Sequence, residues 1–219
     1  MCFSTEASFT AALVLGVAGG LTLKNTTSKS QFFIAAIPLL FAIQQFSEGL
    51  IWLYLGKHIG THEMFIHAQL SFLTFAFLIW PIWIPLSFFM IEPIKWKRIA
   101  LLILLSFGIA LSFLNLTYAM REDISISIVN HSIQYSGHVP EQMITYPLIT
   151  LLPMFISSLR NIWIYGLLTL LAFIAANYFY TATFTSVWCF FSAVISIMIY
   201  KILKDNLTDI EKGSFEEIK

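Results

Sequence analysis

The residue with the clearest chemical potential is Glu48, an acid within a long apolar segment. It stands in QFFIAAIPLLFAIQQFSEGLIWLYL, residues 31–55, which is long enough to cross a bilayer. A carboxylate at that depth costs several kcal/mol unless it is neutralised, paired or wetted, so it marks a candidate functional site. Gln44 and Gln45 precede Glu48 by four and three residues, so their amides share its face of a helix and can hydrogen-bond to it. The pattern predicts a ligand- or proton-binding group.

Two physical situations are compatible with such an acid. Burial in hydrocarbon favours the neutral form, whereas a cation, a metal or a water-filled cavity favours the carboxylate. The sequence does not choose between them. A protonated Glu48 that the two glutamines hold as a purely structural contact between helices is the alternative to a functional site.

A second constellation contains ligand types that suit zinc or copper. It consists of Cys2, His67, His131 and Cys189, with Glu48 as a further ligand. No HExxH, HxxxH or CxxC spacing is present, and the ligands come from separate segments. A metal centre is therefore predicted only if the fold brings these segments together. The two cysteines could instead form one disulfide on an oxidising side of the membrane, or remain free thiols.

Composition indicates the medium in which these groups act. The 219 residues are 58% hydrophobic and only 11% charged, with a mean hydropathy of +0.81. Soluble domains average about 25% charged residues, so the chain is predicted to be an integral membrane protein in contact with membrane lipid. The formal net charge is zero, which gives no basic field for nucleic acid.

Apolar stretches that could each supply the roughly 20 residues of a spanning helix recur seven times. They predict an all-α bundle of seven transmembrane helices. The fifth stretch is short and contains Pro147 and Pro153, so it spans only if residues near Glu141 contribute to its start. The stretches cover residues 7–23, 31–55, 65–91, 98–119, 143–159, 162–180 and 184–203.

The cations favour one orientation, because short cytoplasmic loops are enriched in Lys and Arg. With seven spans and the amino terminus outside, only Lys57 and Arg121 fall on the outer side. Glu92 lies among several of the inner cations and indicates a charge cluster at the membrane surface. The inner cations are Lys24, Lys29, Lys95, Lys97, Arg98, Arg160, Lys201, Lys204, Lys212 and Lys219.

The expected organisation is one transmembrane domain over residues 1–204, with an outer loop at 120–142, followed by a polar cytoplasmic tail at 205–219. In the outer loop, Ile124, Ile126 and Ile128 alternate with serines, which predicts a short strand. In the third span, WPIWIP at residues 80–85 predicts a kink, because each proline removes a backbone donor.

This topology places the candidate residues at one level of the bundle. At 1.5 Å per residue, Glu48 and Cys189 each lie about 10 Å below the outer boundary. Asn115 and His67 lie somewhat shallower, and the remaining histidines fall on the outer side. The sequence therefore predicts a polar pocket open to the outer face, with Asn115 as a further ligand-binding residue.

Four strings carry a resemblance that covers nearly the whole chain: MCFSTEASF, IPLLFAIQQFSEGLIW, WPIWIPL and VWCFFSA. With their motifs MCFS-x-x-ASF, IQQ-x-x-EG-x-W and VWCFF, they resemble a family of bacterial integral membrane proteins without an assigned activity. The resemblance implies a multi-pass protein of the bacterial inner membrane. It also implies that Cys2, Gln44, Gln45, Glu48, Trp80, Trp188 and Cys189 fall within the recurring blocks of the family.

Three functions follow from these patterns. The first is a transporter or sensor that binds a small solute, a proton or a metal ion around Glu48. The second is a membrane-embedded, metal-dependent hydrolase acting on lipid, in which a cation activates water and Glu48 is the general base. The third is a non-catalytic scaffold, which predicts a polar layer fully satisfied by internal hydrogen bonds.

Overall fold

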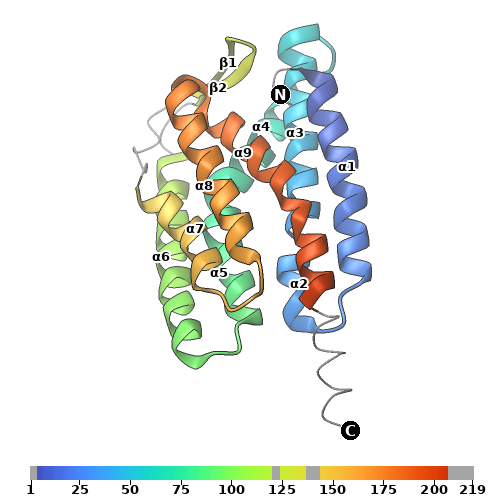
Figure 1. Ribbon diagram of the computed structural model, residues 1–219. Coiled ribbons are helices and arrows are strands. Elements are labelled where there is room, and N and C mark those ends of the chain that lie inside the picture. The colour runs from blue at the N-terminus through green and yellow to red at the C-terminus, as the bar shows by residue number, and fades with distance from the viewer. Residues whose placement is uncertain (1–3, 120–123, 137–143, 207–219) are drawn as a thin grey trace, which may run out of the picture.

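The computed structural model describes residues 4–119, 124–136 and 144–206, which form a helical bundle with one small β-hairpin at one end (Figure 1). Cys2, Arg121, His138 and the tail beyond Asn206 lie outside the described residues. The helical elements are α1 (Thr5–Lys24), α2 (Lys29–Ala35), α3 (Ile37–Lys57), α4 (His62–Thr74), the π-helical turn η1 (Phe75–Ile79), α5 (Trp80–Ile91), α6 (Lys95–Ala119), α7 (Thr145–Ile156), α8 (Ile162–Phe179), the 3-10 turn η2 (Thr181–Thr183) and α9 (Phe184–Ser196).

Six helical segments in the described part of the chain are long and apolar enough to cross a membrane. The predicted helical bundle is therefore confirmed, but the fifth of the seven predicted spans is not among the six. Its helix, α7, has 12 residues, and at 1.5 Å per residue it reaches only about 18 Å across a hydrocarbon core of about 30 Å. Residues 137–143, which would have to lengthen it, lie outside the described ranges.

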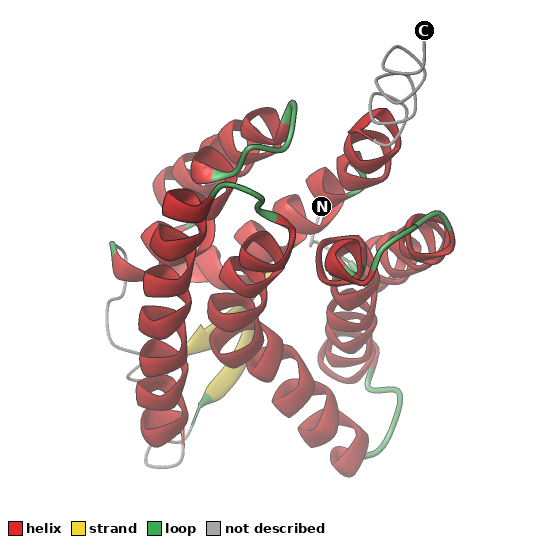
Figure 2. Ribbon diagram, turned by 90° about the horizontal axis from the view of Figure 1, so that it is seen from below, coloured by secondary structure: helices red, strands yellow, loops and turns green. Residues whose placement is uncertain are grey.

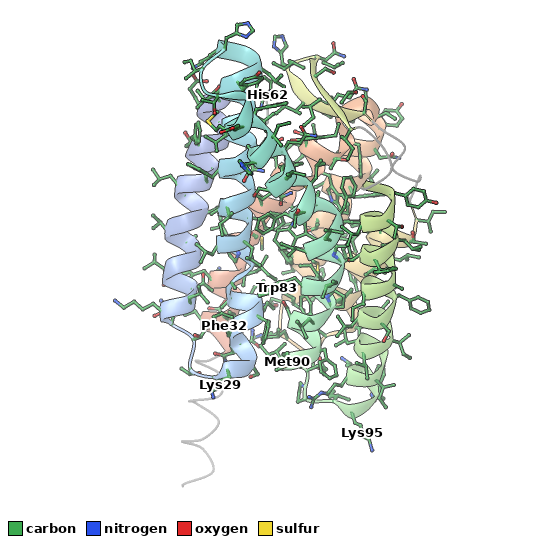
Figure 3. All side chains as sticks on the ribbon, turned by 180° about the vertical axis from the view of Figure 1, so that it is seen from behind. Lys29, Phe32, His62, Trp83, Met90 and Lys95 are labelled. Atoms are coloured by element: carbon green, nitrogen blue, oxygen red, sulfur yellow. The ribbon has the colours of Figure 1, made fainter. Side chains whose placement is uncertain are left out.

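The two ends of the bundle differ in charge. Lys29 and Lys95 lie at one end and His62 at the other (Figure 3). The amino end of α1 and the β-hairpin both lie at the His62 end (Figure 1), and the view from below shows the hairpin behind the helices (Figure 2). This arrangement agrees with the grouping of cations that the sequence predicts.

The hairpin confirms the strand predicted from the alternating isoleucines. β1 (Ser125–Val129) pairs antiparallel with β2 (Ser132–Ser136) through a turn at Asn130 and His131, both with positive φ. Such turns match the twist of the two strands. Ile133 of β2 is fully buried, so the hairpin is packed onto the helices and is not a free loop.

Close packing of α1 on α3 depends on small residues. A Cβ atom at Gly19 would lie 2.6 Å from the backbone nitrogen of Leu39, and one at Gly49 would lie 2.8 Å from the ring of Phe9. Helices inside a bilayer gain no hydrophobic drive for association, so contact of this kind between backbones supplies the attraction. The close approach aligns α1 along α3, which carries Glu48.

The irregular part of the third span precedes its prolines. Pro81 has no N–H to offer Phe77, and Pro85 has none to offer Pro81, so these carbonyls lose their helical partners. The chain widens into the π-helical turn η1, in which the N–H of Trp80 reaches the carbonyl of Phe75. The structure thus has a π-helical turn immediately before WPIWIP, where the sequence predicts a kink.

Side chains from α6 and α7 satisfy three consecutive carbonyls in η1. In a membrane, a backbone carbonyl without a partner would cost several kcal/mol, so these bonds allow the helix to break its regular pattern. The bonds run from Tyr146 Oη to the carbonyl of Ala76 (2.5 Å), from Asn115 Nδ2 to that of Phe77 (2.9 Å) and from Ser112 Oγ to that of Leu78 (2.9 Å).

Glu92 closes the opposite end of the bundle. The residue is buried, and its carboxyl accepts hydrogen bonds from the backbone N–H of Ser158 (2.7 Å), the hydroxyl of Ser158 (2.8 Å) and the N–H of Ile94 (3.2 Å). The α5–α6 turn is thereby attached to the α7–α8 turn. The sequence predicts a surface charge cluster here, whereas the fold uses the acid as an internal link between two turns.

We expect Gly108→Ala to destabilise the protein, because a Cβ at Gly108 would lie 1.9 Å from the carbonyl oxygen of Pro81. Overpacking a well-packed contact costs about 1–3 kcal/mol, and a clash with backbone should reach the upper part of that range. Thermal unfolding in detergent measures the change. Gly20→Ala is the matched control, since nothing lies within 4 Å of its added methyl group. Equal melting temperatures for the two variants would contradict this account of α5–α6 packing.

Candidate functional site

The candidate site lies on the buried face of α3. Gln44, Gln45 and Glu48 are each 0% exposed, and Ser47 is nearly so. Their spacing of three and four residues places them on one side of the helix, as the sequence predicts. Four polar side chains in one turn of a transmembrane helix are costly unless they bond to one another or to a ligand. We call these four residues with Ser186 and Cys189 of α9 the polar layer.

Glu48 is held between two helices. Its Oε1 accepts a hydrogen bond from the hydroxyl of Ser186 on α9, and its Oε2 accepts one from Nε2 of Gln45 at 3.2 Å. No Lys or Arg within the described ranges forms an ion pair with it. The acid therefore joins α3 to α9 through neutral hydrogen-bonding groups. Both of these groups can also accept a hydrogen bond, because a hydroxyl and an amide each have an acceptor oxygen.

Gln44 connects the polar layer to α5. Its Oε1 accepts a hydrogen bond from the indole N–H of Trp80 at 2.8 Å, and the Trp80 ring stacks on Phe41 with centroids 4.0 Å apart. Gln44 also lies against Cys189, whose thiol faces Glu48 as well and is a weak hydrogen-bonding group. The first Trp of WPIWIP thus orients an amide of the site from the neighbouring helix.

The polar layer has more hydrogen-bonding capacity than its own residues use. Each buried polar atom without a partner costs roughly 1–3 kcal/mol, and such atoms commonly bind water or a ligand. Within the described residues, the unpartnered atoms on or beside the layer are Gln45 Oε1, Trp52 Nε1 and Trp188 Nε1. Trp52 follows Glu48 by four residues on α3, and Trp188 precedes Cys189 on α9.

A small cavity adjoins the layer on the side of the bundle centre. It has a volume of about 40 Å³, and its walls include Trp80, Tyr146, Trp188 and Cys189. A water molecule needs roughly 10–15 Å³ of such space, so the cavity has room for about three waters or one group of similar size. Trp80 and Cys189 line this cavity and also contact Gln44, so these residues connect a molecule in the cavity to the polar layer around Glu48.

The hairpin covers the layer on its other side. Ile133 of β2 packs with Trp52, Phe72 and Cys189 in one apolar cluster, and Tyr135 stacks on Phe72 with centroids 4.7 Å apart. The sequence predicts a pocket around Glu48 that is open to the outer face. The structure instead encloses Glu48 completely, and the hairpin that the sequence leaves in an outer loop packs on Trp52 and Cys189 beside it.

The structure separates the other predicted residues from Glu48. Asn115 lies on α6 and bonds to the carbonyl of Phe77, His67 is exposed on α4, and His131 is exposed at the tip of the hairpin. Of the predicted metal ligands in the described part of the chain, Glu48 and Cys189 lie at the polar layer, and Cys2 lies outside the described residues. In the part of the chain that is described, no three His, Cys, Asp or Glu side chains are grouped to hold a metal ion. Zinc or copper binding therefore has no support in the arrangement.

Ser186 is the site residue that the sequence reasoning misses. A serine in an apolar helix gives little signal by itself, because it can bond to its own helix. Its spacing could have revealed it, since Ser186 precedes Cys189 by three residues and both face α3. The hydroxyl of Ser47, 2.8 Å from that of Ser71 on α4, likewise ties the layer to a third helix.

Comparison with known proteins finds no match among curated proteins and none among solved structures. A family model described as "Family of unknown function (DUF6629)" matches residues 1–212. This match covers every element of the bundle, including α3 with Glu48 and α9 with Ser186, and the chain belongs to this family of unknown function.

Proposed function

We propose that the protein is a multi-pass transporter or sensor of the bacterial inner membrane, and that it binds a proton or a small polar solute at the polar layer around Glu48. The amino end of α1 and the hairpin face outward in this proposal, because the opposite end carries the cations of the helix ends. The species that binds at Glu48 reaches it from the outer side when the hairpin moves.

One observation carries the proposal: a fully buried acid lies among polar atoms whose hydrogen bonds are incomplete. In a scaffold, we would expect every polar side chain of the layer to have a hydrogen-bond partner within the protein. Each unsatisfied polar group in a bilayer reduces stability, and a scaffold gains nothing in return. The metal-dependent hydrolase would need a set of ligands that the described residues do not bring together. A binding site for a proton or a polar solute accounts for both the buried acid and the incomplete hydrogen bonds around it.

Binding of a proton at Glu48 would change the hydrogen bonds between α3 and α9. When Glu48 is ionised, both of its oxygens accept, and Ser186 and Gln45 donate. When Glu48 is protonated, its O–H becomes a donor, and one of these neighbours must turn to accept that hydrogen bond, which frees the neighbour's own donor. Ser186 lies on α9 and Gln45 on α3, so exchange of one proton changes the bond between two helices. A change in helix–helix bonding is a suitable step for a gate or a signal.

We expect Glu48→Gln to abolish proton exchange at the layer, because an amide keeps the size and hydrogen bonds of the side chain but cannot titrate. Infrared difference spectra of the protein in lipid nanodiscs, recorded between two pH values, should show a carboxylic acid C=O band that this variant lacks. Glu63→Gln is the control, since Glu63 is exposed at the start of α4. A buried-acid band that persists in Glu48→Gln would refute the assignment.

Binding of a polar solute has a separate readout. In thermal-shift measurements on nanodiscs, a solute that occupies the polar layer should raise the melting temperature of the natural protein and of Glu63→Gln, with a much smaller rise in Glu48→Gln. A panel of small amino acids, amines and carboxylates serves as the probe. Equal shifts in the three proteins would place the binding elsewhere.

Orientation is tested with single cysteines at the two ends. Ser127→Cys lies on exposed β1, and Thr27→Cys lies on the exposed α1–α2 turn. A membrane-impermeant maleimide should label Ser127→Cys in intact spheroplasts and Thr27→Cys only after permeabilisation, with the unaltered protein as the baseline. The reverse pattern would show that the cationic end faces outward.

A further inference from the structure

A second site lies away from Glu48, in a groove between α4 and α6. The groove has a volume of about 640 Å³ and is bordered by α4, the π-helical turn η1, α6 and strand β1. Most of its lining is apolar; the polar lining residues are Gln69 and Ser125 near the hairpin and Thr74 and Asn115 deeper in the groove. The apolar lining includes Leu70, Leu73, Phe77 and Leu116.

The groove follows from the irregular third span. α6 packs along α5 and η1, whereas α4 packs mainly on α3. Because the π-helical turn lies between α4 and α5, the two halves of this span face different neighbours, and α4 diverges from α6 toward the end that carries His62 (Figure 3). Strand β1 lies across the opening at that end, where Gln69 Nε2 donates to the carbonyl of Ile124 at 3.3 Å.

The rim of the groove faces outward, and its floor is covered. Leu70 is 56% exposed and Leu116 is 41% exposed, whereas Leu73 is only 8% exposed. All three belong to segments that are long and apolar enough to cross a membrane. The medium outside the rim is then hydrocarbon, so the groove opens sideways into the bilayer and not into water.

The dimensions and polarity of the groove match one lipid chain. From Phe65 to Leu78, both of which line it, the chain advances thirteen residues, or about 20 Å at 1.5 Å per residue. One leaflet supplies about 15 Å of hydrocarbon core, and roughly 20–22 Å when its headgroup region is included. Gln69 and Ser125 lie at the hairpin end, where the headgroup region would be. Leu73 and Phe77 lie deeper, together with Thr74 and with Asn115, whose amide donates to the carbonyl of Phe77.

We propose that this groove is a binding site for an acyl chain of a membrane phospholipid from the leaflet at the hairpin end. The chain lies between α4 and α6 over Leu73 and Phe77, and the ester and headgroup region lies beside Gln69 and Ser125. The site is independent of Glu48 and does not rest on the proposed transport or sensing function.

The test uses a phosphatidylethanolamine that carries a photoactivatable diazirine midway along one acyl chain. The full-length protein is placed in nanodiscs that contain this lipid, irradiated and mapped by mass spectrometry. We expect labelling on Leu73, Phe77 and Leu116 to exceed labelling on Leu171 and Ile174 several-fold. The latter two lie on α8, are each 53% exposed and line no described groove, so they report ordinary contact with bulk lipid.

A variant that fills the groove distinguishes lipid bound in the groove from bulk lipid that contacts the surface of the protein. Leu73→Trp should reduce labelling of the groove to the level of α8, and Leu171→Trp, its matched control, should leave groove labelling unchanged. If Leu73→Trp does not fold, Leu70→Trp at the exposed rim replaces it. Equal labelling of groove and α8 in the natural protein would mean bulk lipid only and would overturn the proposal. Crosslinks between two copies of the chain across α4 and α6 would also overturn it.

Discussion

The hydrogen bonds that Glu48 makes to Ser186 and Gln45 are the interaction on which the core of this bundle depends. Glu48 is enclosed by protein, and in a bilayer no bulk water is available to replace a missing partner. The acid must therefore be bonded from within, and the donors come from its own helix and from α9. Their positions determine how closely α3 and α9 can approach and which faces they present to each other.

The same constraint accounts for the third span. Two prolines remove backbone donors from a helix that has no solvent to compensate for them. The fold responds with a π-helical turn and with three side chains that bond to the carbonyls of residues 76–78. Tyr146 and Asn115 thus serve the backbone of another helix. The irregular span also places the indole N–H of Trp80 where it donates to Gln44, and it directs α4 away from α6.

Much of the fold follows from hydropathy and from single residues. The apolar stretches predict the helices, the isoleucines at 124, 126 and 128 predict the strand, and WPIWIP marks the irregular turn. The shortness of α7 could also be anticipated, since the fifth apolar stretch is short and contains two prolines. These features are local, and one-dimensional patterns report local structure well.

The site was harder to predict, because proximity between helices has no signature in one sequence. Glu48, Gln44 and Gln45 are found correctly on one buried face, since helical spacing decides that. Asn115 and His67 share roughly the predicted depth with Glu48 but face other directions, and depth along a helix does not determine azimuth. Ser186 was missed for the same reason. Its partner lies 138 residues away, and only the packing of α9 on α3 reveals it.

The enclosed position of Glu48 finally constrains how the protein could work. A group that exchanges protons or binds a solute must at some moment have a path to water, and the described structure gives Glu48 none. The nearest removable barrier is the hairpin, because Ile133 and Tyr135 cover the layer while the transmembrane helices below are tied together by backbone and carbonyl contacts. The hairpin buries few large side chains, so its displacement costs less than separation of α3 from α9. The hairpin, which packs on Trp52 and Cys189 next to the polar layer, is therefore the element whose displacement the fold opposes least.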